Sequence, residues 1–161
     1  MPNRWTFQIA PIADLLARYV GDGKNWVDPF AGETSPAEFT NDLNPNAKAK
    51  SHLTALDFLR SLRGEYDGIL FDPPYSLRQM KEVYDSVGIP MTGRELAFGE
   101  ERELISNLIK PNGYAISFGW SSSGIGKQKG FEIVEILLVC HGGVHNDTIV
   151  VVEQKTQPNL F

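Results

Sequence analysis

Hydrophobic residues in the first two thirds of the chain follow two alternating patterns. Short apolar runs are typical of buried strands, and longer segments with an apolar stripe at every third or fourth position are typical of helices. These patterns and the Gly, Pro, Asn and Asp residues between them predict strands over residues 25–27, 38–41, 68–71 and 114–118, and helices over residues 11–20, 45–50, 56–62 and 100–110. Because strands that alternate with helices generally run parallel, this region predicts a parallel α/β sheet.

The last third of the chain has a different pattern. Two long β-type runs, residues 131–139 and 148–152, are separated by the Gly-rich segment 141–147, with no helix between them. This spacing is typical of a hairpin, so we expect an antiparallel hairpin at the edge of the sheet. No linker or repeat divides the sequence, which predicts a single domain over residues 1–161, with residues 154–161 as a flexible tail.

Composition narrows the class of protein further. Of the 161 residues, 42% are hydrophobic, and the formal net charge is −5. This acidic balance argues against a protein that coats nucleic acid through bulk positive charge. No apolar run approaches the roughly 20 residues of a membrane span, and the first residues lack the apolar segment of a signal peptide. Together with the single Cys140, these features predict a cytoplasmic protein with no internal disulfide and no membrane partner.

The segment Asp72-Pro73-Pro74-Tyr75 carries the clearest chemical signal. It follows the buried strand at 68–71, and open α/β sheets bind ligands at the carboxyl ends of their strands. The prolines stiffen the segment and remove two backbone donors, so its carbonyls and the carboxylate suit an amino group that donates two hydrogens. The tyrosine ring offers a surface on which a planar base could stack. The alternative is a proline-stiffened turn without a catalytic role.

This segment resembles the catalytic motif of the S-adenosylmethionine-dependent amino-methyltransferases that act on adenine N6 or cytosine N4. Other segments are similar to the same family, in an order that places the cofactor motif before the catalytic motif. In the resemblance, Asp42 stands where the family binds the ribose hydroxyls, and Asp57 and Phe58 where it contacts the cofactor's adenine. The resemblance implies that the residues holding S-adenosylmethionine are Phe7, Ile9 and Pro11 before the first strand, Asp28, Pro29, Phe30, Ala31 and Gly32 directly after it, Asp42, Asp57 and Phe58.

The resemblance implies a Rossmann-like methyltransferase fold and direct methyl transfer to the N6 amine of adenine in DNA. Asp72, Pro73, Pro74 and Tyr75 would form the catalytic site, where the carboxylate and the Pro73 carbonyl accept the amine hydrogens. The target base would be single-stranded or flipped out of a duplex. Two other functions stay open: methylation of RNA or of cytosine N4, and a binding module that keeps the fold without catalysis.

Two departures from the family pattern modify these expectations. Glu33 follows Gly32 directly, and only six residues separate Gly32 from Phe39, so we expect the first crossover helix to be absent or reduced to one turn. A helix N-terminus that anchors the cofactor's methionine end would then be missing. The sequence also lacks a separate target-recognition domain, which favours weak sequence specificity, recognition through loops, or a homodimer.

The long connection 76–99 is the first candidate contact region for DNA, and it carries Arg78, Lys81 and Arg94. Loops of more than about 12–15 residues are usually functional or disordered, and in the resembling family this region closes over cofactor and target. The alternative is an ordinary surface helix over residues 77–87.

The second candidate region follows the strand at 114–118. Trp120 is placed to line a base pocket, and Lys127 and Lys129, on the mobile Gly/Ser-rich loop 121–129, to contact phosphates. The alternative is a solvated loop without a ligand.

The predicted hairpin turn carries Cys140, His141, His145 and Asp147, whose side chains can ligate metals. The two glycines at 142–143 exclude the helix that an i, i+4 histidine pair requires, so we expect no metal site there.

The segment Gln157–Phe161 resembles the bacterial sliding-clamp-binding motif, a Gln followed two residues later by a small polar residue and then Leu-Phe. Bound to a sliding clamp, this segment would raise the effective concentration of the protein at replicating DNA. The alternative is that Leu160 and Phe161 fold back on their own domain.

Overall fold

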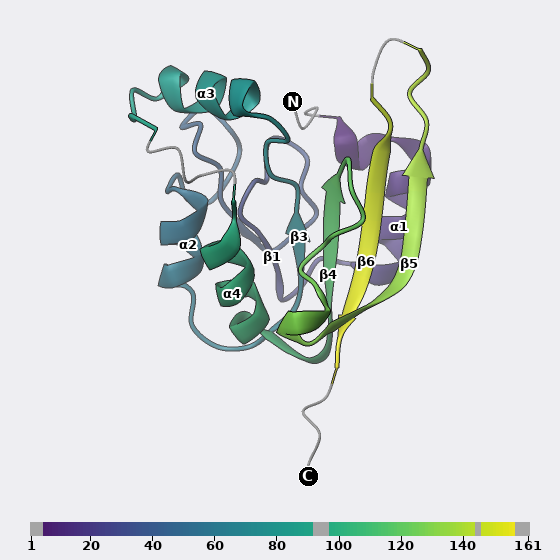
Figure 1. Cartoon of the computed structure of the whole chain (residues 1–161). Helices are drawn as coiled ribbons and strands as arrows, with labels where there is room; N and C mark the ends of the chain where they lie inside the picture. Colours follow the sequence, from purple (N-terminus) through teal and green to yellow (C-terminus); the bar gives the residue numbers. More distant parts are fainter. Residues whose placement is uncertain (1–4, 92–96, 144–145, 157–161) are drawn as a thin grey trace.

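The structure is a computed structural model that describes residues 5–91, 97–143 and 146–156. Its centre is a six-stranded sheet with the strand order β2-β1-β3-β4-β6-β5 (Figure 1). The strands are β1 (Trp26–Asp28), β2 (Phe39–Thr40), β3 (Tyr66–Phe71), β4 (Ile109–Gly119), β5 (Phe131–Val139) and β6 (Thr148–Lys155).

Strand direction explains why polar side chains that could bind a ligand lie at the same end of this sheet, where the parallel strands have their carboxyl ends. β2, β1, β3 and β4 run parallel, whereas β6 pairs antiparallel with both β4 and β5. The predicted α/β class, the mostly parallel sheet and the C-terminal hairpin are therefore confirmed. Since β1 and β3 end at the same edge, Asp28 and Asp72 lie close enough for their charges to interact.

Helices cover both faces of the sheet. In the described part of the chain they are α1 (Ala10–Tyr19), α2 (Ala55–Ser61), α3 (Leu77–Ser86) and α4 (Gly99–Leu108), with the short 3-10 helices η1 (Thr6–Gln8) and η2 (Lys127–Lys129). α1 lies behind β5 and β6, while α2 and α4 lie on the other side of the sheet (Figure 1). None of these described helices is long and apolar enough to cross a membrane.

Alternation along β3 divides the buried side chains into two cores. Leu70 packs on the α1 face with Ile12 of α1, whereas Phe71 packs on the opposite face with Ile105 of α4. Successive side chains of a strand point to opposite faces, so a continuous apolar run can serve both cores. Asp72 directly follows this run. The two cores packed on β3 therefore fix its position at the carboxyl end of that strand.

The crossover between β1 and β2 contains no helix over residues 29–38, as the short spacing predicted. Residues 45–50 also lack the predicted helix and form turns and bends. The backbone N–H of Asn44 donates to Oδ1 of Asp42 at 2.9 Å, and that of Asn46 donates to Oδ1 of Asn44 at 3.0 Å. Short side chains that accept nearby backbone N–H groups compete with helix formation, which explains why the prediction was wrong.

β4 and β6 are longer than predicted. β4 begins at Ile109 rather than at residue 114, and its close approach to β3 requires Gly113, where a Cβ would lie 2.8 Å from the carbonyl oxygen of Asp67. Gln154 and Lys155 belong to β6, so the flexible tail predicted from residue 154 starts too early. The ammonium of Lys155 donates to the carbonyl of Ile109 at 2.6 Å, which fixes the end of this strand.

Candidate functional site

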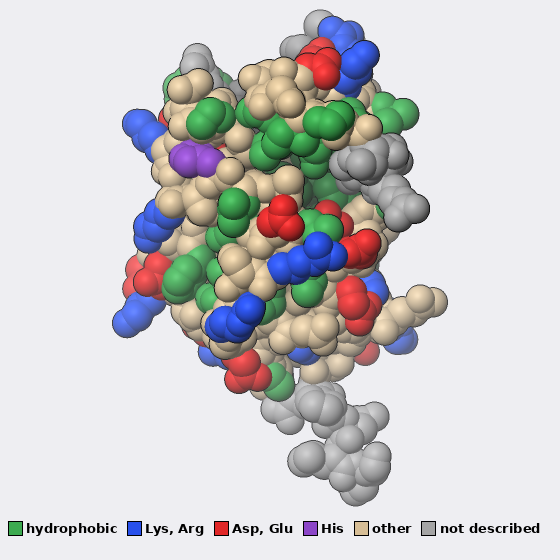
Figure 2. Space-filling view, turned by 90° about the vertical axis from the view of Figure 1, so that its left-hand side faces the viewer, with side chains coloured by type: hydrophobic (Ala, Val, Ile, Leu, Met, Phe, Trp, Pro, Cys, Tyr) green, Lys and Arg blue, Asp and Glu red, His purple; other side chains and the backbone are tan. Residues whose placement is uncertain are grey.

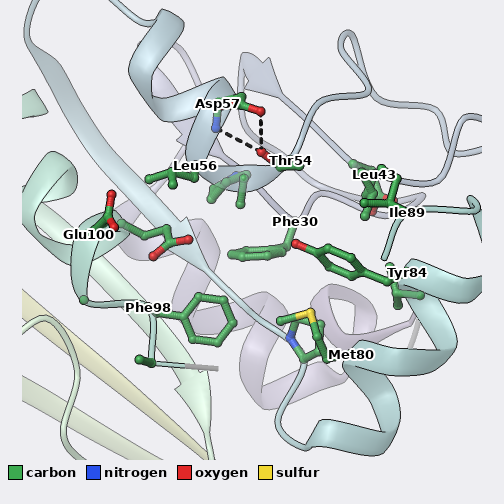
Figure 3. A pocket seen from close by; sticks show the side chains of 18 of the residues that line it. Phe30, Leu43, Thr54, Leu56, Asp57, Met80, Tyr84, Ile89, Phe98 and Glu100 are labelled. Atoms are coloured by element: carbon green, nitrogen blue, oxygen red, sulfur yellow. Dashed lines mark hydrogen bonds between the residues drawn. The ribbon is translucent and has the colours of Figure 1, made fainter. Parts of the chain in front are cut away.

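A pocket of about 770 Å³ opens at the carboxyl ends of β1 and β3. Phe30 from the loop after β1 and Met80 and Tyr84 from α3 converge in it, and Phe98 closes one side (Figure 3). We call this space the first pocket. It is lined by Pro29, Phe30, Asp42, Leu43, Thr54, Ala55, Leu56, Asp57, Pro74, Met80, Val83, Tyr84, Ile89, Pro90, Ala97, Phe98, Gly99, Glu100 and Glu101.

Asp42 forms a polar part of this wall, two residues after β2. Its Oδ2 accepts the N–H of Gly32 at 2.9 Å, and its Oδ1 accepts the N–H of Asn44 at 2.9 Å. A carboxylate has about four lone-pair positions, so Asp42 keeps acceptor capacity beyond these two bonds. The same side chain thus fixes the loop after β1 and supplies an acceptor in the first pocket.

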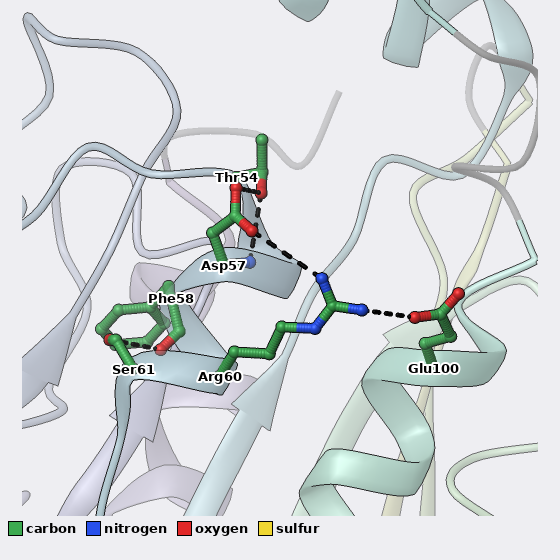
Figure 4. A network of polar contacts seen from close by, with 6 residues as sticks. All are labelled: Thr54, Asp57, Phe58, Arg60, Ser61 and Glu100. Atoms are coloured by element: carbon green, nitrogen blue, oxygen red, sulfur yellow. Dashed lines mark hydrogen bonds and ion pairs between the residues drawn. The ribbon is translucent and has the colours of Figure 1, made fainter.

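The start of α2 forms the other polar wall (Figure 4). The hydroxyl of Thr54 accepts the N–H of Asp57 at 3.1 Å and donates to the Asp57 carboxylate at 2.9 Å. Arg60 lies 4.0 Å from Asp57 and donates to Glu100 of α4 at 2.8 Å, which links the two helices. Asp57 is thereby held at the pocket wall by contacts within and between helices.

The predicted pair Asp57 and Phe58 is separated by the structure. Asp57 lines the first pocket, whereas Phe58 is 5% exposed and packs in the core with Leu59. Consecutive residues of a helix do not share a face, and the sequence pattern did not show which of the two would turn inward.

Asp28 is fully buried at the end of β1 and lines neither pocket described here. Its Oδ1 accepts the N–H of Phe30 at 2.9 Å, and its Oδ2 accepts the hydroxyl of Ser35 at 2.6 Å. Burial raises the pKa of Asp28 to about 8, although both hydrogen bonds act in the lowering direction. The charges of Asp72 and Asp42 raise it further. Asp28 therefore shapes the crossover loop from inside.

The remaining residues of the predicted cofactor motif have two roles. Some line the first pocket, and the others belong to the loop after β1 without lining it. Pro29 and Phe30 line the first pocket. Ala31 is 4% exposed and is not among the lining residues. Gly32 has a positive φ of 56°, which favours glycine, and its N–H donates a hydrogen bond to the Asp42 carboxylate.

Asp72 directly follows β3 and is 2% exposed. The hydroxyl of Tyr75 donates a hydrogen bond to its Oδ1. Burial raises the pKa of Asp72 to about 7, although the Tyr75 hydrogen bond acts in the lowering direction. The pKa of Tyr75 is raised by its own burial and by the Asp72 charge. Buried groups with shifted pKa values cluster at functional sites, so this pair marks a candidate active site.

A second pocket of about 350 Å³ adjoins the first, and Pro74 and Phe98 line both. Trp120 lies in it beside Tyr75, with the two ring centroids 5.5 Å apart. Trp120 therefore lines a pocket next to the Asp72 segment. The second pocket is lined by Phe71, Pro73, Pro74, Tyr75, Phe98, Arg102, Ser117, Phe118, Gly119, Trp120, Ser121, Ser123 and Gly124.

Phe7, Ile9 and Pro11 line neither of these pockets. The Phe7 ring packs edge-on against Phe118 with centroids 5.4 Å apart, on the α1 face of the sheet. Ile9 precedes α1, and Pro11 occupies its first turn, where a fixed φ favours helix initiation. The structure does not bring these residues to the first pocket because they order the start of α1.

The predicted phosphate contacts Lys127 and Lys129 lie away from the carboxyl ends of the parallel strands. They form η2, beside the amino end of β4, and Lys129 pairs with Glu103 of α4 (Figure 1). The loop that leads there is tied to the sheet, since the N–H of Ile125 donates to the buried Glu153 carboxylate at 2.6 Å. The sequence pattern does not reveal this internal acceptor. The first part of the predicted loop does lie beside the site, since Ser121, Ser123 and Gly124 line the second pocket, whereas Lys127 and Lys129 do not.

Arg78 and Lys81 lie on α3, which lines the first pocket through Met80. α3 matches the surface helix that was the alternative for this region. Arg78 is exposed and pairs with Glu82 at 2.9 Å, and Lys81 is also exposed. The face shown in Figure 2 mixes acidic and basic side chains, with hydrophobic ones gathered in its upper half. Arg94 lies outside the described residues.

Several lining residues were missed by the sequence analysis. Met80 and Tyr84 lie four positions apart in α3, a helical spacing that could have indicated a shared face. Ser117 interrupts the apolar strand pattern, which was a signal for a polar group inside the sheet. Phe98 and Arg102 had no such local signal.

In the described part of the hairpin turn, residues 140–143 and 146–147, no side chain lines either pocket. Within the ranges given for the structure, no group of three or more His, Cys, Asp or Glu side chains is arranged to hold a metal ion. Cys140 is exposed, and the N–H of His141 donates to Asp147 at 3.0 Å. His145 and the clamp-type segment 157–161 lie outside the described residues.

No protein-family model and no curated protein sequence match the chain. Solved methyltransferases do match it in fold. N-methyltransferase NodS from Bradyrhizobium japonicum WM9 has a TM-score of 0.56 and 13% identity, covering 98% of this chain and 100% of that one. The Burkholderia thailandensis 1,6-didemethyltoxoflavin-N1-methyltransferase, solved with that compound and S-adenosylhomocysteine, has a TM-score of 0.60 and 17% identity, covering 96% and 82%.

TrmN from Thermus thermophilus is similar over a shorter share of its own length. Its TM-score is 0.55 and its identity 19%, over 89% of this chain and 48% of that one, so this chain spans about half the length of TrmN. At sequence identities of 13%, 17% and 19%, the similarity to these structures establishes the fold alone. The chain has the Rossmann-like fold of class I S-adenosylmethionine-dependent methyltransferases.

Proposed function

We propose that this protein transfers a methyl group from S-adenosylmethionine to the N6 amine of adenine in DNA. The observation that supports this best is the position of Asp72, buried directly after β3 in a segment that borders two adjoining pockets. Methyl transfer needs a donor and an acceptor held in close alignment. The first pocket is the proposed cofactor site, and the second is the proposed base site.

The residues of the first pocket fit S-adenosylmethionine in size and in chemistry. Its volume of about 770 Å³ lies within the roughly 300–1,000 Å³ that is typical of small-molecule sites. The apolar side chains of Phe30 and Leu56 suit a planar adenine, and the carboxylate of Asp42 suits ribose hydroxyls. Since the β1–β2 crossover has no helix, these walls and Asp57 would carry most of the cofactor affinity.

S-adenosylmethionine, when bound, supplies an electrophilic methyl group on a positively charged sulfur. The chain's task is to activate the amine, whose lone pair is delocalised into the ring. Asp72 and the carbonyl of Pro73 accept the two amine hydrogens, which favours a pyramidal nitrogen with its lone pair directed away from the ring. Asp72 also takes the proton that the amine loses, since burial raises its pKa to about 7.

DNA is the proposed polymer, and Arg78 and Lys81 of α3 are its proposed phosphate contacts. Because the surface in Figure 2 mixes both signs of charge, we expect few contacts and weak, salt-sensitive binding. A homodimer, and a sliding clamp bound through residues 157–161, are further proposals that would raise the local concentration of the protein on DNA.

Mass spectrometry of nucleosides tests the proposal. DNA and RNA are incubated separately with the protein and isotope-labelled S-adenosylmethionine, with Asp72→Ala as the control. We expect labelled N6-methyldeoxyadenosine that the control does not produce. Label in RNA or on cytosine N4 would replace the proposed substrate by its alternatives. Binding of S-adenosylmethionine in calorimetry without label in any nucleoside would favour a non-catalytic binding module.

A further inference from the structure

The second pocket contains a polar side chain that packing alone does not explain. Ser117 lies in β4 between Phe71 of β3 and Val151 of β6, and it is 8% exposed. Among the described residues, its hydroxyl is the one buried side-chain polar atom without a hydrogen-bond partner. A buried hydroxyl without a partner opposes folding, and an apolar side chain there would avoid that cost. Ser117 is therefore better explained by a ligand than by the core.

Arg102 of α4 lines the same pocket and has donors to spare. Its Nε donates to the carbonyl of Gly124 at 3.0 Å, and its Nη1 donates to the carbonyl of Ala97 at 2.9 Å. A guanidinium carries five N–H groups, so these two bonds leave further donors. In the part of the chain that the structure describes, no carboxylate lies within 4.0 Å of it as an ion-pair partner. Its Cζ lies 5.8 Å from the centre of the Phe71 ring, within the range of a cation–π contact.

The remaining walls suit a flat ring. Tyr75 and Trp120 contribute aromatic rings to the lining, and Trp120 is 47% exposed. A volume of about 350 Å³ lies at the lower end of the range for small-molecule sites, which suits a single base rather than a larger group. A phosphate would also pair with arginine and serine, but it would gain nothing from the aromatic surfaces.

We propose that Ser117 and Arg102 recognise the hydrogen-bonding edge of the ring that carries the target amine. The guanidinium donates to a ring nitrogen, and the hydroxyl pairs with a second polar atom of the same ring. The ligand class is an amino-substituted nitrogen heterocycle, and these two residues select it while Asp72 orients its amine. This inference rests on the proposed function and names the residues that determine its specificity.

The first test uses base analogues and measures binding without turnover. Short fluorescent single-stranded oligonucleotides carry one adenine, one 1-deazaadenine or one 7-deazaadenine, in which a ring nitrogen is replaced by C–H. We expect the wild type to bind at least one analogue about tenfold more weakly than adenine, and Arg102→Met to bind all three alike. Equal binding of the three by the wild type, or unchanged discrimination by Arg102→Met, would overturn the proposal. Where Arg102→Met does not fold, Arg102→Lys, which keeps the charge and loses the planar fork, replaces it.

The second test separates ligand recognition from a structural role. Ser117→Ala is compared with Ser61→Ala, whose hydroxyl donates to the carbonyl of Phe58 at 2.7 Å and lies in neither pocket. We expect Ser117→Ala to melt at or above the wild-type temperature and to bind the adenine oligonucleotide about tenfold more weakly. Ser61→Ala should melt at a lower temperature and bind normally. A lower melting temperature with normal binding in Ser117→Ala would make its hydroxyl structural and would refute the proposal.

Inorganic phosphate serves as a competitor in both titrations. Displacement of the oligonucleotide by millimolar phosphate in the wild type but not in Arg102→Met would assign the pocket to an anion instead of a ring. These readouts are independent of methylation. If bases are discriminated but no nucleoside is methylated, the proposed function fails and the recognition site stands. If DNA adenine is methylated while both variants discriminate normally, the proposed function stands and the proposed recognition role of Ser117 and Arg102 fails.

Discussion

The hydroxyl of Tyr75 donates a hydrogen bond to Oδ1 of Asp72, so the two polar side chains of the candidate catalytic segment hold one another. The bond stabilises the ionised carboxyl, while burial favours the neutral one, and burial prevails with a pKa of about 7. Tyr75 lines the second pocket, whereas Asp72 lines neither pocket and is reached only where this segment borders the second one. The protonation state of this one side chain therefore controls the proposed chemistry.

Tyr75→Phe is expected to shift the pH dependence of methyl transfer. The proposed reaction needs ionised Asp72, so wild-type activity should fall as the pH drops through about 7. Removal of the Tyr75 hydroxyl removes a contact that lowers the pKa of Asp72, so the acidic limb should move to higher pH. The measurement is kcat between pH 5.5 and 9, with Trp120→Phe as a control that leaves this hydrogen bond intact. A limb at the same pH in Tyr75→Phe and the wild type would show that Asp72 does not govern the rate.

Asp72→Ala should abolish methyl transfer and leave cofactor affinity within about tenfold, or ~1.4 kcal/mol. Asp72 is assigned to the target amine and does not line the first pocket, so cofactor contacts are preserved. Calorimetry with S-adenosylmethionine and a methylation assay measure the two effects separately. Near-normal turnover in this variant would remove Asp72 from the mechanism.

Asp42→Ala should weaken cofactor binding by ~1–3 kcal/mol, because ribose hydroxyls would lose a charged acceptor. In this structure the substitution also frees the N–H groups of Gly32 and Asn44, so it should lower the melting temperature. Asp42→Asn keeps one acceptor oxygen and should recover part of both effects. If Asp42→Ala binds S-adenosylmethionine as tightly as the wild type, the ribose site lies elsewhere.

Asp28 should make folding stability fall as the pH rises. Its pKa is about 8 in the folded protein, against a usual value of 3.8, so the folded state holds one more proton between these values. One extra proton in the folded state lowers the free energy of unfolding by about 1.4 kcal/mol per pH unit of increase. Urea denaturation at pH 5, 6 and 7 should show this slope reduced by about that amount in Asp28→Asn. The exposed Asp85→Asn is the control, and equal slopes in all three proteins would contradict the assignment.

Salt dependence distinguishes the two pairs of candidate phosphate contacts. Each phosphate contact contributes about −0.9 to the slope of log affinity against log salt on duplex DNA. Replacement of Arg78 and Lys81 by Gln should therefore reduce the slope by about 2, whereas replacement of Lys127 and Lys129 should leave it unchanged. The second pair lies at the opposite end of the sheet, which makes it a matched control. A larger change from the second pair would place the nucleic acid on a different surface.

The fold could be predicted from the sequence because its signals are local. The apolar run at 68–71 indicates a buried strand on its own, and the six-residue spacing from Gly32 to Phe39 leaves no room for a full helix. The early start of β4 could not be predicted in this way. It depends on Gly113 lying against the carbonyl of Asp67, a contact between residues far apart in the chain.

Part of the candidate site could likewise be predicted from the sequence, and part could not. The Asp72 segment is recognisable because consecutive prolines after a strand constrain the backbone whatever surrounds them. The position of Lys127 depends on Glu153, a buried carboxylate in another strand that accepts the N–H of Ile125. Arg102 enters the second pocket only because α4 packs over Phe71. Contacts of this kind exist only once the sheet has formed.

β6 lies between β4 and β5 although it follows both in the chain, so Ser117 of β4 pairs with Val151 of β6. During synthesis, β4 therefore leaves the ribosome with one edge unpaired until β6 has followed. Unpaired strand edges and uncovered apolar surface attract other chains. We expect the nascent protein to rely on chaperones during this interval. Substitutions that weaken β6 should then reduce the yield of folded protein more than the activity of the molecules that do fold.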